Sequence, residues 1–166
     1  MRIRILLSLL SFLLLVPGLS SAAERKMVIQ ITSMDPAVQK MALNSAKNLK
    51  KLLGKDTVDV EVVVYGPGIT LLKSSGRSAD KIKSLMADYD VNVSVCDGAL
   101  EAYAKRHGGN ELEIIDGVSK VPTGAIRILE LQEKGYAYLR PLLLHIISIL
   151  FFDGGENNWF KNSPFK

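Results

Sequence analysis

The chain has 166 residues, 48% of them hydrophobic, which suits a single globular domain with a substantial core. Its formal net charge of +4 includes Arg2 and Arg4, which we expect to be removed, so that 19 of the 21 basic residues remain against 17 acidic ones and the mature charge is about +2. Because the sequence also lacks a basic run interleaved with aromatic residues, it argues against a nucleic-acid partner.

Residues 1–23 are predicted to form a cleaved signal peptide. Arg2 and Arg4 precede an apolar stretch at residues 5–16, which is shorter than the about 20 residues that a membrane-spanning helix needs. Residues 20–23 then supply the small side chains of a cleavage site, which favours cleavage over a retained membrane anchor. We therefore predict a periplasmic or secreted protein without a stable membrane span.

The mature chain opens with a predicted strand and a long helix. Residues 27–31 form a short apolar run, and Asp35 with the following proline marks the start of a helix. Apolar residues recur at helical spacing over 38–53, and Gly54 ends the helix. Four basic residues near its end are predicted to form one solvated face. These are Lys47, Lys50, Lys51 and Lys55.

Residues 58–65 give the clearest strand pattern in the chain. Valines alternate along one face, whereas Asp59 and Glu61 begin the opposite face, so that face is expected to be wetter at its start than at its end. A tight loop at residues 66–68 and one helical turn at 69–72 are predicted to follow.

The later elements continue the alternation of strands and helices. In chain order they are a helix at 79–89, a strand at 91–96, a helix at 99–106, a weak strand or turn at 112–115, an extended piece from Val121, a helix at 125–134 and a strand at 136–139. This order predicts an α/β fold with a mostly parallel sheet of about five strands, covered by helices on both faces and joined by right-handed crossovers.

The predicted domain covers residues 24–141, and a tail of different character follows at 142–166. The tail is apolar over 142–152 and ends with polar and aromatic residues. It is too short to span a membrane. Packing on the domain, burial in an oligomer contact and a shift of reading frame all remain open as explanations.

Ligands of parallel α/β sheets bind beyond the carboxyl ends of the strands, where loops and helix N-termini gather. Those ends fall in the segments 32–35, 65–68, 96–98 and 122–124. The candidate pocket residues there are Ser33, Asp35, Gly66, Pro67, Gly68, Asp97, Thr123 and Gly124.

Cys96 is the only cysteine and the one candidate nucleophile at this edge. It lies where a strand gives way to a helix, and the free backbone N–H groups of a helix N-terminus can stabilise a thiolate. Asp97 would oppose that effect, and a cysteine that closes an apolar strand is often a buried, inert side chain. Spacing alone leaves the reactive and the inert interpretation open. His107 lies a helix-length away, so a cysteine–histidine pair is not expected.

Neither a nucleotide site nor a metal site is predicted. The first two glycines of a dinucleotide fingerprint appear at Gly66 and Gly68, but Leu71 stands at the third position and Pro67 lacks an N–H. A turn is the favoured interpretation of this loop. The two histidines have no acidic or cysteine residues at ligand spacing, so we expect no metal and no cofactor.

Several of these segments together resemble the DsrE/DsrF-like family, named for its link to sulfur oxidation. The resemblance covers about residues 26–141 and rests on the opening strand, the segment 60–72, the strand ending in Cys96, and the segments 121–124 and 130–138. It implies a flavodoxin-like three-layer sandwich that assembles as a homotrimer or homohexamer. It further implies that Cys96 is at the position where some members carry a persulfide.

The leading hypothesis from the sequence is an exported sulfur carrier that holds a persulfide on Cys96 and exchanges sulfur with a donor or acceptor protein. The alternative is a non-catalytic, oligomeric binding or assembly module of the same fold, in which the cysteine is structural.

Overall fold

The computed structural model describes residues 25–142. The predicted signal peptide and all but the first residue of the predicted tail lie outside this range, so these two predictions are not addressed by the structure. No helix within residues 25–142 is both long and apolar enough to cross a membrane.

The described chain folds around a five-stranded sheet of order β4-β3-β2-β1-β5. Every pairing in the sheet is parallel. The strands are β1 (Arg25–Ile31), β2 (Val58–Val64), β3 (Asn92–Cys96), β4 (Ser119–Val121) and β5 (Ala137–Leu139). The predicted α/β class with a parallel five-stranded sheet is therefore confirmed.

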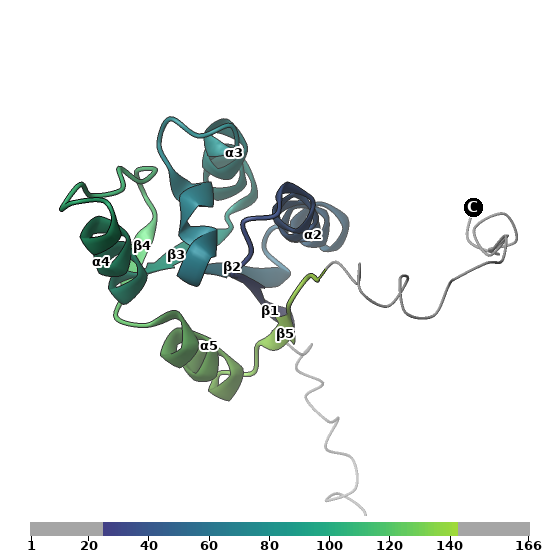
Figure 1. Ribbon diagram of the computed structural model, residues 1–166. Coiled ribbons are helices and arrows are strands. Elements are labelled where there is room, and N and C mark those ends of the chain that lie inside the picture. The colour runs from purple at the N-terminus through teal and green to yellow at the C-terminus, as the bar shows by residue number, and fades with distance from the viewer. Residues whose placement is uncertain (1–24, 143–166) are drawn as a thin grey trace, which may run out of the picture.

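Helices cover both faces of this sheet, which gives the predicted flavodoxin-like three-layer sandwich (Figure 1). The chain advances from β1 to β4 in one direction and then returns past β1 to β5. Right-handed crossovers therefore put the first three α-helices on one face and the returning helix on the other. The helices are α2 (Pro36–Leu53), η1 (Gly66–Leu72), α3 (Ala79–Tyr89), α4 (Asp97–Arg106) and α5 (Gly124–Glu133).

Helix α2 begins directly after Asp35, as the sequence predicts, whereas α4 begins two residues earlier than predicted. The carboxylate of Asp35 accepts hydrogen bonds from the backbone N–H groups of Ala37 (2.7 Å) and Val38 (3.4 Å), so the capped helix α2 includes Pro36 in its first turn. Helix α4 begins at Asp97 directly after β3, with no intervening loop. Cys96 consequently occupies the N-cap position of this helix.

The apolar core is divided unequally between the two faces of the sheet. Side chains of the three central strands pack with α2, α3, α4 and η1 in the larger cluster. The smaller cluster under α5 contains only Val28, Val63, Ile128 and Leu131, with Tyr65 and Tyr136 packed against it. The face under α5 is therefore thinly covered, and polar side chains occupy much of the rest of it.

On that face of β2 Asp59 is half-buried, and Glu61, which the sequence pattern places on the wetter part of the strand, is buried. Arg127 of α5 donates two hydrogen bonds to the Glu61 carboxylate, of 2.8 and 2.7 Å, and Ser94 of β3 donates a third of 2.8 Å. The Glu61 side chain is only 4% exposed and that of Arg127 is 28% exposed. A buried carboxylate is tolerated because all three contacts compensate for its lost hydration.

The predicted solvated lysine face is wrong for Lys50, which is almost fully buried. Its aliphatic stem lies in the packed face of α2, and its ammonium group donates a hydrogen bond to the carbonyl of Lys55 (3.1 Å). Asp90 lies 3.6 Å away as a counter-ion. Lysine can bury its stem while its charged end reaches polar partners, which a helical pattern of charges cannot reveal.

Replacement of Arg127 by methionine should destabilise the protein by about 3 kcal/mol, because it leaves a buried carboxylate without its counter-ion. Urea unfolding at neutral pH measures this change. The control Glu130→Gln removes only the exposed partner of the same arginine, 3.4 Å away, and should cost less than about 1 kcal/mol. Equal effects of the two substitutions would contradict the assigned role of Glu61.

The stability of the fold should also decline in alkaline solution because of Tyr136. Burial raises the pKa of this phenol above its ordinary value of 10.0, and its hydrogen bond to Asp59 raises it further. The unfolded chain therefore loses the proton near pH 10 while the folded chain keeps it, so stability present below pH 10 is lost as the pH rises. Urea unfolding from about pH 8 to pH 11 should show this decline. Tyr136→Phe should start less stable and depend less on pH, and an equally steep profile would refute the assignment.

Candidate functional site

Cys96 lies at the carboxyl edge of the sheet, where β3 meets α4. The residue is 9% exposed, and its sulfur lies 3.8 Å from the carbonyl oxygen of Pro122, to which the thiol can donate a weak hydrogen bond. Alternation along β3 turns Val93 and Val95 into the larger core, so Ser94 and Cys96 point to the face that carries α5. The sulfur is thus largely buried beside a backbone carbonyl, and Cys96 belongs to neither apolar cluster.

One glycine lies beside this sulfur, and a second lies against Tyr65. A Cβ atom on Gly98 would lie 3.8 Å from both the Cys96 sulfur and the Pro122 carbonyl oxygen. A Cβ atom on Gly124, the first residue of α5, would lie 2.5 Å from the ring of Tyr65. Glycine at position 124 therefore allows the Tyr65 ring to pack directly on the backbone at the start of α5.

Tyr65 adds a phenol to the neighbourhood of the thiol. Burial raises the pKa of this phenol above 10.0, and electrostatic interactions with Tyr138 and Cys96 raise it further. Arg140 and a hydrogen bond with Gln30 partly oppose this rise in pKa. Since Tyr138 in turn donates a hydrogen bond to Gln30, these polar groups form a network at the ends of β1, β2 and β5. The Tyr65 hydroxyl stays protonated at neutral pH and can serve as a hydrogen-bond donor.

The segment 66–68 belongs to the 3₁₀-helix η1 and shapes this edge through its backbone. Gly66 has φ +57°, a conformation that side chains disfavour. A Cβ atom on Gly68 would lie 2.8 Å from the carbonyl oxygen of Ile31. Pro67 occupies the first turn, as proline does where an N–H has no helical partner. These residues direct the chain away from β2 rather than contact the sulfur.

Ser33 and Asp35 are used in the turn that opens α2. The Ser33 hydroxyl oxygen accepts a hydrogen bond from the backbone N–H of Asp35 (3.0 Å), and the carboxylate of Asp35 caps the helix. Both predicted pocket residues therefore have a local structural role.

Asp97 and Thr123 adjoin the thiol in sequence but differ in what they contact. Asp97 lines a separate hollow of about 430 Å³, between α4 and the loop that leads to β4. Thr123 is the extended residue before α5, and its side chain makes no capping hydrogen bond.

The structure therefore brings together Cys96, Tyr65, Gly98 and the segment 122–124. The sequence alone did not point to Gln30 and Tyr138, although a glutamine within an apolar strand is a signal of a buried polar contact.

No group of three His, Cys, Asp or Glu side chains that could hold a metal ion occurs between residues 25 and 142. His107 stacks on Tyr103 at the end of α4, with ring centroids 3.9 Å apart, and the Tyr103 carbonyl lies 2.8 Å from its Nδ1. His145 lies outside the described residues.

Comparison with known families settles the assignment of the domain. The family model described as "DsrE/DsrF-like family" matches residues 25–141. The chain belongs to this family. Membership connects this DsrE/DsrF-like protein with sulfur relay at the level of the family. No curated protein matches it significantly.

Three solved structures share the fold of this DsrE/DsrF-like protein. MTH1491 of Methanobacterium thermoautotrophicum, a protein of unknown function, is 26% identical with a TM-score of 0.62, and the match covers 70% of this chain and 99% of that one. BT1422 of Bacteroides thetaiotaomicron, a conserved protein of unknown function, is 16% identical with a TM-score of 0.51, covering 73% and 98%. The ychN protein of E. coli is 14% identical with a TM-score of 0.52, covering 70% and 98%.

Replacement of Gly124 and replacement of Gly98 by alanine should have opposite effects on the stability of the protein. Gly124→Ala forces a methyl group into the Tyr65 ring and should destabilise the protein by about 1–3 kcal/mol. Gly98→Ala adds an ordinary contact within a helix and should leave stability unchanged or raise it by up to about 1 kcal/mol. Urea unfolding of both variants tests this contrast.

Gly98→Ala also tests access to the thiol. Gly98→Ala should slow alkylation of Cys96 by iodoacetamide in the folded protein, because its methyl group lies beside the sulfur. An alkylation rate equal to that of the wild type would show that reagents approach from another direction.

Proposed function

We propose that this DsrE/DsrF-like protein is an exported sulfur carrier that holds a persulfide on Cys96. The observation that carries the proposal is the position of the sulfur. It lies at the carboxyl edge of a parallel sheet, at the N-terminus of α4, and 3.8 Å from a backbone carbonyl oxygen. Membership in a family linked to sulfur relay supports the same function.

The proposed reaction moves one sulfur atom without net oxidation. The Cys96 thiolate attacks the outer sulfur of a low-molecular-weight or protein persulfide, and a new sulfur–sulfur bond forms. The sulfur–sulfur bond of the donor breaks, and its inner sulfur leaves as a thiolate that takes up a proton. An acceptor thiolate then attacks the outer sulfur on Cys96 and regenerates the free cysteine.

The surroundings of Cys96 suit a charged sulfur. Free backbone N–H groups of the first turn of α4 favour negative charge at this position. Gly98 places no side chain beside the sulfur. Asp97, the nearest carboxylate in sequence, lines the hollow beside α4. These features support a persulfide anion in a site that has little room for a larger group.

Export and oligomerisation form part of the proposal. The charged and apolar segments within residues 1–23 support secretion to the periplasm or beyond. Two large apolar side chains on the outer side of α5, Ile126 and Leu129, are 54% and 56% exposed, which supports a homotrimer or homohexamer that covers them. Sulfur would be exchanged with a donor or acceptor protein.

Incubation of the mature protein with glutathione persulfide tests the proposal. Because the chain has a single cysteine, intact mass spectrometry should show the gain of one sulfur atom on the wild type and none on Cys96→Ser. A reducing agent should remove the added mass. Gly124→Ala, compared at equal folded fraction, should retain the gain.

An absence of any cysteine-dependent gain of sulfur, with Cys96 intact and the protein folded, would contradict the carrier. It would favour the second candidate, a non-catalytic binding or assembly module of the same fold. The low exposure of Cys96, 9%, is the observation that favours this module, since a structural cysteine needs no access.

A further inference from the structure

A hollow of about 470 Å³ lies between α2 and α3, on the face of the sheet opposite to Cys96. We name it the α2–α3 pocket. Its walls come from the loop after β1, the first turns of α2, the segment η1 and the start of α3. Figure 1 shows α2 and α3 side by side above the sheet. The hollow thus lies beyond the carboxyl ends of β1 and β2, where parallel α/β sheets place their ligands.

The charges on this pocket are positive. Lys40 of α2, Arg77 before α3 and Lys81 within α3 line it, and no carboxylate does. Among the residues that the structure describes, none of these three side chains forms an ion pair. The Lys81 ammonium instead donates a hydrogen bond of 2.7 Å to the neutral side chain of Asn44. Three cationic groups therefore surround one hollow without compensation by protein carboxylates.

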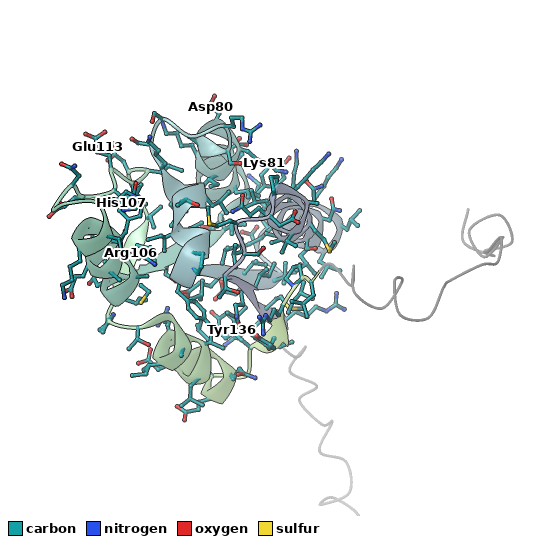
Figure 2. The ribbon with its side chains drawn as sticks, in the orientation of Figure 1. Asp80, Lys81, Arg106, His107, Glu113 and Tyr136 are labelled. Carbon is teal, nitrogen blue, oxygen red and sulfur yellow. The ribbon has the colours of Figure 1, made fainter. Side chains whose placement is uncertain are left out.

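The two acidic residues nearest in sequence to the pocket, Asp35 and Asp80, do not neutralise its cations. Asp35 caps the first turn of α2 with its carboxylate. Asp80 is exposed, and in Figure 2 it lies at the outer side of α3, whereas Lys81 lies on the side that faces α2. Burial lowers the pKa of Lys81, and the positive charges of Lys40 and Lys47 lower it further. This direction agrees with a site that lacks its counter-ion.

The start of α3 adds hydrogen-bond donors to the same hollow. Ser78 precedes the helix, lines the pocket and makes no capping hydrogen bond with its side chain. Its hydroxyl is therefore available to an anion, as are the N–H groups of the first turn other than that of Ala79, which donates to the carbonyl of Gly76. Helix α3 has 11 residues, and its axial dipole reinforces the three cations at this end.

The remaining wall is apolar and can hold the body of a ligand. Met34, Leu43 and Leu71 line the pocket; Met34 is 60% exposed, whereas Leu43 and Leu71 are almost fully buried behind it. A volume of about 470 Å³ exceeds what a lone phosphate fills and is in the range of small-molecule sites. Cations at one side and apolar side chains at the other fit an amphiphilic organic anion.

We propose that the α2–α3 pocket binds a phosphorylated small molecule, with its phosphate groups on Lys40, Arg77 and Lys81 and its organic part on Met34. The phosphate oxygens accept charge-assisted hydrogen bonds from the cations and from the start of α3. This site is separate from Cys96, so its occupancy does not depend on whether the protein carries sulfur.

Isothermal titration of the folded protein with adenosine diphosphate, inorganic pyrophosphate and adenosine tests the proposal. Adenosine diphosphate should bind more tightly than pyrophosphate, adenosine should bind least, and added salt should weaken binding of both anions. The double variant Arg77→Met/Lys81→Met should weaken binding of adenosine diphosphate by at least about tenfold. The matched control Lys83→Met replaces an exposed lysine of the same helix that does not line the pocket, and should bind as the wild type does.

Urea unfolding of each variant separates a loss of binding from a loss of fold. Equal binding of pyrophosphate and adenosine diphosphate, both sensitive to the double variant, would overturn the role of the apolar wall, because the site would then take the inorganic anion itself. No binding of either anion at millimolar concentration would overturn the proposal. Binding unaffected by the double variant, or equal binding of adenosine, would overturn it as well.

Discussion

The parallel pairing of β1, β2 and β3 determines where chemistry can occur in this protein. In this register Ile31 lies beside Val64, and Val64 lies beside Val95, so the three strands end at one edge. The segments that follow them are Thr32–Asp35, η1 and the first turn of α4, and they must therefore meet there. Cys96 and the α2–α3 pocket both follow from this constraint, one on each face of the same edge.

The order of the strands also explains why the two faces differ. Three crossovers run in one direction and put α2, α3 and α4 on one face, which gives that face its continuous apolar core. A single helix of 10 residues, α5, returns across the other face and covers less of it. The gaps are filled by paired polar groups, above all Glu61 with Arg127 and Ser94. Such pairs hold α5 in a defined position, and α5 in turn supplies the backbone against which Tyr65 packs.

Local patterns in the sequence were sufficient to predict the class and most of the elements, although β4 ends at Val121, where the predicted extended piece begins, and residues 112–115 supply only an isolated bridge. The valine alternation of residues 58–65, the capping signal at Asp35 and the glycine after residue 53 each act over a few residues, and the structure agrees with each of them. Contacts between distant residues were beyond such patterns. Glu61 and Arg127 are 66 residues apart in sequence, and the close packing of Tyr65 on Gly124 joins segments from two different crossovers. Lys50 shows the same limit, because its counter-ion Asp90 follows α3, 40 residues later in the sequence.

The segment η1 links the two candidate sites through a rigid backbone. It begins next to Tyr65, which lies near Cys96, and its later residues Thr70 and Leu71 line the α2–α3 pocket. Gly68 packs on the carbonyl of Ile31, and Ile69 and Leu72 are almost fully buried, so the segment cannot shift without disturbing the core. A thiol that exchanges small sulfur groups and a pocket that holds an anion both need side chains in fixed positions. The packing of η1 supplies that rigidity to both faces of the sheet edge.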